Sequence, residues 1–359
     1  MLVILSHPAS ARPLHRFQRW HLTLMDISQY AVGPEDIDVL SRFQIINFFH
    51  RQKSVTKNDC DLTAARITGS QVSPTLVQGE ASYTVAADTS QLPKVVQFRP
   101  SALNLGLMNR ARQTYGEFVP YCELHGMLAD VYVYEMDFVP GVAFSRARRQ
   151  LFAPGMEHCL VRTVQDFARF FASAWISRPV LGQTADTTSK LFAHYTWILD
   201  QLSQALPERF QPSLREVRHG LPLLFRADYP LVLNHDDLLE MNIHVDEGTG
   251  HITGIVDWAD AIIAPFGTSL GGLETILGVQ TSSSWLFHAK HDYLRAQFWK
   301  TFYGCIGYIS DTDRQAIEVG RKFSLFRTYG FDRRPERDNA APLDAGDQEF
   351  VCLEAFCLR

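Results

Sequence analysis

The chain has 359 residues, 46% of them hydrophobic and 20% charged, so it is long enough to bury one large or two medium cores. Its formal net charge of −5 argues against nucleic-acid binding, which depends on clustered Lys and Arg side chains. The apolar start breaks at Pro8 and lacks the features of a signal peptide, and no apolar run reaches the ~20 residues that span a bilayer. We therefore expect a cytoplasmic protein with no membrane partner.

The first part of the chain has the pattern of a mixed α+β lobe. An apolar stripe predicts a helix over 34–52, followed by a polar stretch over 53–61. The stripe consists of Ile37, Leu40, Phe43, Ile46 and Phe49. Short runs of β-forming residues then predict a small antiparallel sheet, with strands at 75–77, 82–87, 95–99 and 130–138 and a helix over 103–115.

The pattern changes from Met156 onward to long helical periodicity. Helices are expected over 156–171, 190–206, 214–224, 270–278, 284–304 and 312–325, with short strands at 231–233, 242–245 and 252–256. The polar stretch 333–346 is expected to be a loose segment. The prediction is thus an N-terminal lobe over 1–138, including a helical extension over about 1–60, and a mainly helical C-terminal lobe over 139–359.

Four polar residues stand around the short strands of the second lobe. Asp237 lies two residues after His235, Asn242 lies five after Asp237, and Asp257 follows a hairpin-like pair of strands. This spacing is typical of the catalytic and metal loops of kinase-like enzymes. In an alternative interpretation, the first three form a polar turn and Asp257 merely ends a strand. The order of all the elements together favours the functional interpretation.

The chemistry of phosphoryl transfer explains each residue type. An acceptor hydroxyl must lose its proton to a carboxylate, and a magnesium ion must neutralise the β- and γ-phosphates of ATP. Asp237 is the candidate for that carboxylate. Mg²⁺ prefers oxygen ligands and keeps several waters, so one amide and one carboxylate suffice. Asn242 and Asp257 are the candidates for this metal site.

Four phrases carry a resemblance to a known family: HDDLLEMNI at 235–243, GHITGIVDW at 250–258, PFG at 265–267 and EMDFVPG at 135–141. With them, residues 70–330 resemble the aminoglycoside phosphotransferase and choline kinase group, and more particularly its fungal small-molecule branch. The resemblance implies a protein-kinase-like two-lobed fold, with a small antiparallel-sheet lobe and a larger helical lobe. Because Asp257 is followed by Trp and no Ala-Pro-Glu motif follows, a protein kinase is not expected.

The resemblance also implies roles in the smaller lobe. The loop with Gln78, Gly79 and Ser82 matches the nucleotide-positioning loop, and Arg99 falls where the family pairs a Lys or Arg with the α- and β-phosphates. By residues alone, the loop is a turn and Arg99 is a surface charge on a strand.

The same comparison implies the adenine site. Met136 would lie at the back of the adenine slot, and the backbone from Asp137 to Val139 would form the hinge that hydrogen-bonds to adenine.

The sequence departs from the family pattern at two places. Asp236 replaces the usual Gly between His235 and Asp237, so two adjacent carboxylates compete for the role of base. The spacing to Asn242 favours Asp237. The helix over 103–113 contains no acidic residue that could pair with Arg99, and Glu117 lies just beyond it.

The acceptor pocket is expected in the helical lobe. The nearest polar and aromatic residues are Glu240, Trp258, Asp260, Phe266, Glu274 and Trp285, although the aromatic ones also suit core packing. An aminoglycoside is a polycation and needs denser carboxylates than this half-aromatic set offers, so a different acceptor is expected.

The sequence therefore predicts an ATP- and Mg²⁺-dependent phosphotransferase that transfers the γ-phosphate to a hydroxyl of a small-molecule metabolite. The alternative is a protein of the same fold without phosphoryl transfer, serving as a binding or regulatory module or catalysing another reaction in the same cleft. The set Asp237, Asn242 and Asp257 favours the first. The missing helix carboxylate and the single-glycine loop favour the second.

Overall fold

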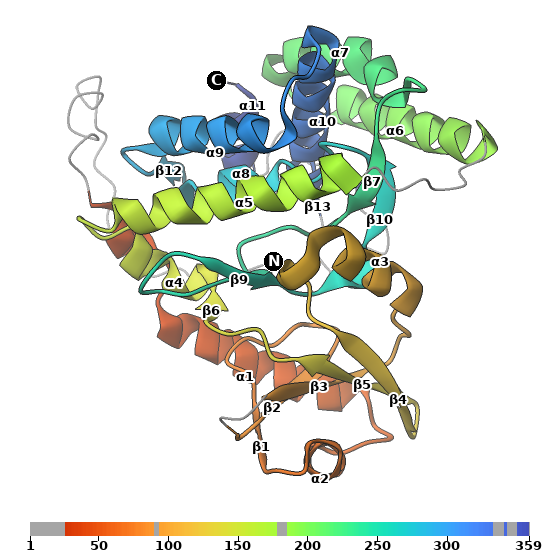
Figure 1. The fold of residues 1–359 in the computed structure, drawn as a ribbon, viewed down its shortest axis with the longest axis vertical. Helices are drawn as coiled ribbons and strands as arrows, with labels where there is room; N and C mark the ends of the chain where they lie inside the picture. The colour runs from red at the N-terminus through yellow and green to blue at the C-terminus, as the bar shows by residue number, and fades with distance from the viewer. Residues whose placement is uncertain (1–25, 90–92, 178–184, 333–340, 343–349, 359) are drawn as a thin grey trace. The chain divides into compact units, whose positions relative to one another are not determined.

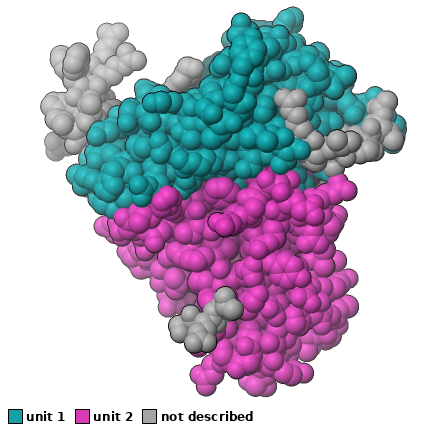
Figure 2. Space-filling view, viewed as in Figure 1, with its two compact units in different colours: residues 1–31, 152–234, 263–359 teal, residues 32–151, 235–262 magenta. Residues whose placement is uncertain are grey.

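The computed structural model describes residues 26–89, 93–177, 185–332, 341–342 and 350–358. The chain divides into two compact units, coloured in Figure 2. We call residues 32–151 and 235–262 the sheet unit, and residues 1–31, 152–234 and 263–359 the helical unit. The expected lobe boundary after residue 138 stays a prediction. The start of the expected helical extension and most of the expected loose segment lie outside the described residues.

Five strands of the sheet unit form an antiparallel sheet within the described residues, in the order β1-β2-β3-β5-β4 (Figure 1). They are β1 (Val72–Pro74), β2 (Tyr83–Ala87), β3 (Lys94–Arg99), β4 (Cys122–Leu128) and β5 (Val131–Asp137). The predicted α+β class with a small antiparallel sheet is confirmed. Strand β4 was not predicted, because its apolar alternation is broken by a register shift between Leu124 and Gly126.

Alternation along the strands separates the two faces of this sheet. Tyr83 and Val85 of β2, with Val96 and Phe98 of β3, are buried in one core together with residues of helices α1 (Pro34–Arg51) and α2 (Lys57–Thr68). Burying each such side chain stabilises the fold by about 1.5–3 kcal/mol. Successive strand residues point to opposite faces, so Arg99 of β3 belongs to the face away from this core.

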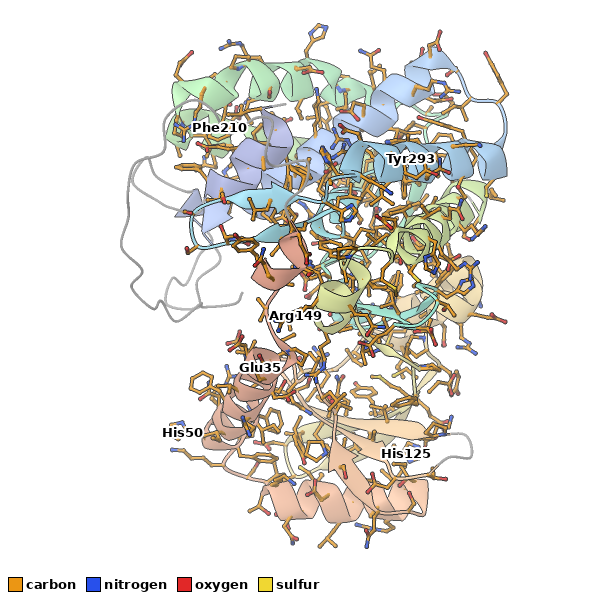
Figure 3. The ribbon with its side chains drawn as sticks, turned by 90° about the vertical axis from the view of Figure 1, so that its left-hand side faces the viewer. Glu35, His50, His125, Arg149, Phe210 and Tyr293 are labelled. Carbon is orange, nitrogen blue, oxygen red and sulfur yellow. The ribbon has the colours of Figure 1, made fainter. Side chains whose placement is uncertain are left out.

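Helix α1 buries only part of the predicted apolar stripe. Phe43 and Ile46 are 58% and 66% exposed, whereas Ile37, Ser41 and Phe48 are buried. A stripe with a strict spacing of three drifts around a helix of 3.6 residues per turn, so it cannot stay on the core side. The hydroxyl of the buried Ser41 has a hydrogen-bond partner: it donates to the Leu76 carbonyl at 2.9 Å. Figure 3 labels Glu35 and His50 near the two ends of α1.

The polar stretch over 53–61 contains the start of helix α2. The helix begins with a capping box, in which the Thr56 hydroxyl accepts from the Asp59 N–H while the Asp59 carboxylate accepts from the Thr56 N–H. This cap and the burial of Cys60 and Ala64 stabilise a helix that polar composition hides.

A second, three-stranded sheet of the sheet unit brings together distant segments. Strand β8 (Ile243–Val245) pairs with both β6 (Val142–Ala143) and β9 (Ile252–Ile255). Gly141 has φ +78, and a Cβ on it would lie 2.2 Å from the Val245 carbonyl oxygen. Glycine is therefore required where the chain leaves β5 toward β6. Helices α3 (Leu105–Tyr115) and α4 (Phe144–Leu151) complete this unit.

The helical unit contains α5 (Glu157–Ser177), α6 (Ala185–Ala205), α7 (Gln211–Gly220), α8 (Gly272–Thr275), α9 (His291–Ile306), α10 (Asp311–Tyr329) and α11 (Phe350–Cys357). Its strands form the pairs β7 (Leu231–Asn234) with β10 (Ile262–Pro265), β11 (Gly278–Gln280) with β12 (Trp285–Phe287), and β13 (Phe331–Asp332) with β14 (Ala341–Pro342). The β11–β12 hairpin replaces parts of two predicted helices. Stacked and edge-on rings of α5 and α9 fill the core, as between Phe167 and Phe298.

Short 3-10 helices lie at Ile27–Tyr30, Gly116–Phe118, Glu208–Phe210, Leu221–Phe225 and Trp258–Asp260. Over the described part of the chain, no helix is long and apolar enough to cross a membrane.

Candidate active site

His235 fixes the start of the loop that precedes β8. It is 2% exposed, its Nε2–H donates to the Val256 carbonyl at 2.7 Å, and its ring meets that of Trp258 edge-on at 4.8 Å. Burial lowers the pKa of His235, which favours the neutral ring that this single donor requires. His235 therefore holds the loop against the residue that precedes Asp257.

Asp237 and Asn242, the predicted base and the predicted metal ligand, are in direct contact. The Asn242 Nδ2 donates to the Asp237 carbonyl at 2.8 Å and to the Asp237 Oδ2 at 3.2 Å. Because the amide group is oriented by its nitrogen, its oxygen points away from this pair. No donor among the described residues contacts that oxygen, which leaves it available as a ligand.

Asp257 follows β9 in a left-handed conformation, with φ 61 and ψ 60. Asp tolerates this conformation better than most residues but still at a cost, so the backbone there directs its side chain to a defined place. Its carboxylate does not cap the short helix that begins at Trp258. It is 47% exposed and lies 3.4 Å from the Arg99 guanidinium. The interpretation of Asp257 as a simple turn residue thus has no supporting hydrogen bond.

Arg99 is the most deeply buried charge at this place, with its side chain 9% exposed. Its Nη1 donates to Gln97 Oε1 and to Asp257 Oδ1, each at 3.4 Å. Its Nε is buried and has no hydrogen-bond partner within the described ranges. Helix α3 carries no acidic residue, and Glu117 is exposed. The carboxylate that accompanies Arg99 is therefore Asp257, at the end of β9.

The loop before β2 is shaped by Gln78. This buried side chain accepts from the Thr84 N–H at 3.0 Å and donates to the Thr84 carbonyl at 2.7 Å and to Thr75. Its amide is thus used within the loop and its backbone N–H donates to the Ser41 Oγ at 3.2 Å, which leaves the N–H groups after it and the Ser82 hydroxyl for a ligand. A Cβ on Gly79 would lie 3.4 Å from the Ser82 Oγ, an ordinary contact distance.

The predicted hinge leaves the sheet at Asp137. Met136 pairs with Val95 of β3. The Asp137 carboxylate accepts from Lys94 Nζ at 2.9 Å and from the Tyr121 N–H at 3.1 Å. Burial raises the pKa of Asp137, but these bonds outweigh it and lower the pKa overall. The acid thus clamps the end of β5 in place.

Val139, two residues further, has a backbone N–H without a partner among the described residues. Its side chain packs so closely on β9 that a Cβ on Gly254 would lie 2.6 Å from Val139 Cγ1. The ring of His244 hydrogen-bonds to the Val139 backbone. Residues of β8 and β9 therefore hold Val139 in place, while its N–H remains available for a hydrogen bond to a ligand.

Negative charge gathers around the metal-ligand candidates. Burial raises the pKa of Asp260, and the nearby carboxylates of Asp257, Asp237 and Asp236 raise it further. Such mutual repulsion favours binding of a cation. In the described part of the chain, no three His, Cys, Asp or Glu side chains converge as a metal site. A metal here would take one carboxylate, one amide oxygen and oxygens of water and substrate, as Mg²⁺ commonly does.

Most residues expected in an acceptor pocket are committed elsewhere. Glu240 pairs with Arg148 of α4 at 3.2 Å, and Trp258 is buried against His235. In the helical unit, Glu274 is buried between two arginines, while Phe266 and Trp285 lie in aromatic clusters. Of the six, Asp260 alone is exposed. Nearness in sequence to the motif therefore did not identify an acceptor pocket.

Sequence reasoning missed Gln97 and gave His235 no role. Gln97 lies between Ser82 and Arg99, and its only sequence signal is a polar residue at a position that alternates with the buried Val96 and Phe98. The role of His235 needs its partner Val256, which only the folded hairpin brings near.

Comparisons with known proteins were made for the sequence and for the fold. No curated protein matches the sequence. Solved structures similar to this chain include the aminoglycoside phosphotransferase APH(4)-Ia, 15% identical, covering 76% of this chain and 91% of that one with a TM-score of 0.48. They also include the spectinomycin phosphotransferase APH(9)-Ia in complex with ADP and spectinomycin, 12% identical, covering 82% and 91% with a TM-score of 0.45.

The match that decides the family covers more than half of the chain. Residues 84–296 match the phosphotransferase enzyme family, APH, a range that includes Arg99, Asp237, Asn242 and Asp257. The predicted family and the predicted kinase-like fold class are confirmed, whereas the fungal branch stays a prediction. This chain belongs to the phosphotransferase enzyme family.

Proposed function

We propose that this phosphotransferase uses ATP and Mg²⁺ and transfers the γ-phosphate to a hydroxyl of a small-molecule metabolite. The observation that carries the proposal is the contact between Arg99 and Asp257. It joins the candidate phosphate-binding cation to the candidate metal ligand, although 158 residues separate them in the sequence. The unpartnered Nε of Arg99 adds a buried donor, which a phosphate oxygen would satisfy.

Asp237 acts as the proton acceptor in this proposal. The bond from Asn242 to Asp237 Oδ2 holds the carboxylate in one orientation and leaves Oδ1 to receive the proton of the acceptor hydroxyl. Asn242 and Asp257 would hold Mg²⁺, which neutralises phosphate charge when bound. Arg99, the backbone of 78–82 and the Ser82 hydroxyl would hold the phosphates. The backbone of 137–139, next to Met136, would hold adenine.

The acceptor is proposed as a small hydroxylated molecule because the site belongs to this family and not to protein kinases. The solved structure of APH(9)-Ia contains spectinomycin. The net charge of −5 supports the exclusion of nucleic acid as a partner, and a cytoplasmic location stays a prediction from the sequence. Glu240 is held by Arg148 and does not add to the carboxylates of the site, which supports an acceptor other than an aminoglycoside.

A second candidate is a binding or regulatory module of the same fold. Two observations favour it: α3 offers no carboxylate to Arg99, and the Gln78 amide is consumed within its own loop. Nucleotide binding followed by measurement of turnover separates the two candidates.

The first test measures thermal unfolding with ATP, with and without Mg²⁺, for the wild type and for Asp257→Ala. A ligand at 100 times its Kd stabilises the folded state by about 2.7 kcal/mol. We expect Mg²⁺ to add to the ATP effect in the wild type and to add nothing in Asp257→Ala.

Glu123→Ala is the matched control, because Glu123 is an exposed carboxylate on β4 of the same unit. It should respond to ATP and Mg²⁺ as the wild type does. If neither nucleotide nor metal stabilises the wild type, the proposal of an ATP-dependent enzyme is wrong. If ATP stabilises it but no phosphate transfer to a panel of small alcohols or to water is measured, the binding module is the better description.

A further inference from the structure

Gln97 lies at the centre of the five-stranded sheet. Strand β3 is the middle strand, and Gln97 pairs with Thr84 on one side and Tyr134 on the other. Its neighbours Val96 and Phe98 are fully buried in the core with α1 and α2, so Gln97 and Arg99 share the opposite face. A polar side chain at such a position requires partners of its own.

Both ends of the Gln97 amide have partners. The Nε2 donates to the Ser82 Oγ at 3.2 Å and to the Thr84 Oγ1 at 3.3 Å. The Oε1 accepts from Arg99 Nη1 at 3.4 Å. One side chain thus links the hydroxyl of the nucleotide-positioning loop to the guanidinium.

Arg99 needs such a partner because its charge is buried. Its carboxylate partner, Asp257, is also the candidate metal ligand and would turn toward a bound cation. Gln97 lies on the same strand as Arg99, so it stays beside the guanidinium whether or not Asp257 turns away. An amide orients the guanidinium without neutralising it, so the full positive charge remains for a phosphate.

We infer that Gln97 is a positioning residue, which holds Arg99 and Ser82 in place for the nucleotide phosphates and takes over the orienting part of the missing helix carboxylate. The inference rests on the proposed function, because it assumes that phosphates bind at Arg99. Gln97 acts through Arg99 and Ser82 and does not itself touch the reacting atoms.

The experiment measures the Kd for Mg²⁺–ADP by calorimetry for the wild type, Gln97→Leu, Gln97→Glu, Arg99→Ala and the double variant Gln97→Leu/Arg99→Ala. Gln97→Leu should weaken ADP binding about 10-fold, the usual size for a lost hydrogen bond to a charged group. Gln97→Glu keeps an acceptor for Arg99 but neutralises its charge and loses the donor to Ser82, so it should weaken ADP binding at least as much as Gln97→Leu. In the Arg99→Ala background, Gln97→Leu should have little further effect.

Gln71→Leu is the matched control, since Gln71 is an exposed residue of the same unit outside the site, and it should bind ADP as the wild type does. The KM for ATP should rise in Gln97→Leu more than kcat falls. Equal effects of Gln97→Leu with and without Arg99 would overturn the inference, because a merely structural role predicts additivity. An unchanged Kd in Gln97→Leu, with a weakened Kd in Arg99→Ala, would overturn it as well.

A readout without nucleotide separates this inference from the proposed function. In protein labelled with ¹⁵N-arginine, the Nε–Hε signal of Arg99 is assigned by its loss in Arg99→Lys. It should move or broaden in Gln97→Leu and not in Gln71→Leu. If the wild type binds no ADP and the signal moves, the proposed function fails while the positioning of Arg99 by Gln97 stands. If the signal is unchanged, the inference is wrong whatever the nucleotide does.

Discussion

Two groups of charges, one in each unit, are built in opposite ways. In the helical unit, the Glu274 side chain is 4% exposed and accepts from Arg295 Nη2 at 2.8 Å and from Arg321 Nη1 at 3.3 Å. In the sheet unit, Asp257 is 47% exposed, and its Arg99 partner lies at 3.4 Å with an unsatisfied Nε. The first carboxylate is enclosed and satisfied. The second is open and under-satisfied.

The difference separates structural from functional charge. A buried carboxylate with two guanidinium partners holds α8 to α9 and α10 and has no capacity left for a ligand. The exposed carboxylate of Asp257 and the buried guanidinium of Arg99, whose Nε has no acceptor, can both still bind a ligand. Titratable groups of the two units should also differ in what a substitution changes, which is turnover in the sheet unit and stability in the helical unit, and three experiments test this.

The largest effect is expected from Asp237→Asn. The amide has the same shape and can still accept from Asn242, but it cannot take a proton, so turnover should fall by about 10²–10⁴-fold. The Kd for ADP and the unfolding temperature should stay close to those of the wild type. Single-turnover kinetics and calorimetry on the same preparation check this. Undiminished turnover would transfer the role of base to the adjacent Asp236.

The next effect concerns stability. Glu274→Gln removes the buried carboxylate between Arg295 and Arg321, which keep only their outer partners Asp292 and Glu318, and should lower the free energy of unfolding by about 1.5–3 kcal/mol. Denaturant unfolding measures this loss. The Kd for ADP of the remaining folded protein should not change. Asp292→Asn, an exposed partner of Arg295, is the control and should cost less than about 1 kcal/mol. Equal costs for the two variants would remove the contrast between the groups.

The smallest effect is a pH dependence carried by His288 of the helical unit. This buried ring accepts from the Lys290 N–H at 3.2 Å. Burial lowers the pKa of His288, with Lys290 and His291 acting in the same direction and Glu157 opposing them. The folded pKa therefore lies below the unfolded value of about 6.5. Stability should fall as the pH drops through that unfolded value and level off below the folded pKa.

His288→Asn should reduce this acid-side loss of stability, because it removes the group that takes up the proton. Unfolding by denaturant at a series of pH values between 7 and 5 measures it. A wild type and a variant with parallel profiles would show that His288 does not contribute.

A feature could be predicted from the sequence when the residues that form it lie close together along the chain. His235, Asp237 and Asn242 directly precede the β8–β9 hairpin and Asp257 directly follows it, so their spacing alone predicted a common site, and the structure shows the contact from Asn242 to Asp237. Hairpin register carries such residues together without help from the rest of the chain. The roles of these residues stay predictions.

The partner of Arg99 could not be found in this way. The family pattern predicts a carboxylate in the helix after β3, whereas the carboxylate that contacts Arg99 belongs to Asp257, just after β9. Gln97 was passed over for a related reason, because a single polar residue in a strand gains meaning only when its neighbours on β2 and β5 are known.

Helix α1 shows how packing overrides hydrophobic composition. The apolar Phe43 and Ile46 stay exposed, while the polar Ser41 is buried because it hydrogen-bonds to the loop that carries Gln78. Hydrophobic spacing alone cannot identify a buried serine with two backbone partners.

The close approach at Gly141 and Gly254 has a mechanical consequence. The first glycine brings the chain onto Val245, and the second receives the side chain of Val139, so the hinge has no slack relative to strands β8 and β9. Interlocked backbones of this kind move as one piece. Adenine bound at Val139 would therefore stand at a constant separation from a cation on Asn242 and Asp257. A nucleotide would then fit only if the distance from its base to its terminal phosphate matches this separation. A shorter or longer donor would lose either the contact at Val139 or the contact with the cation.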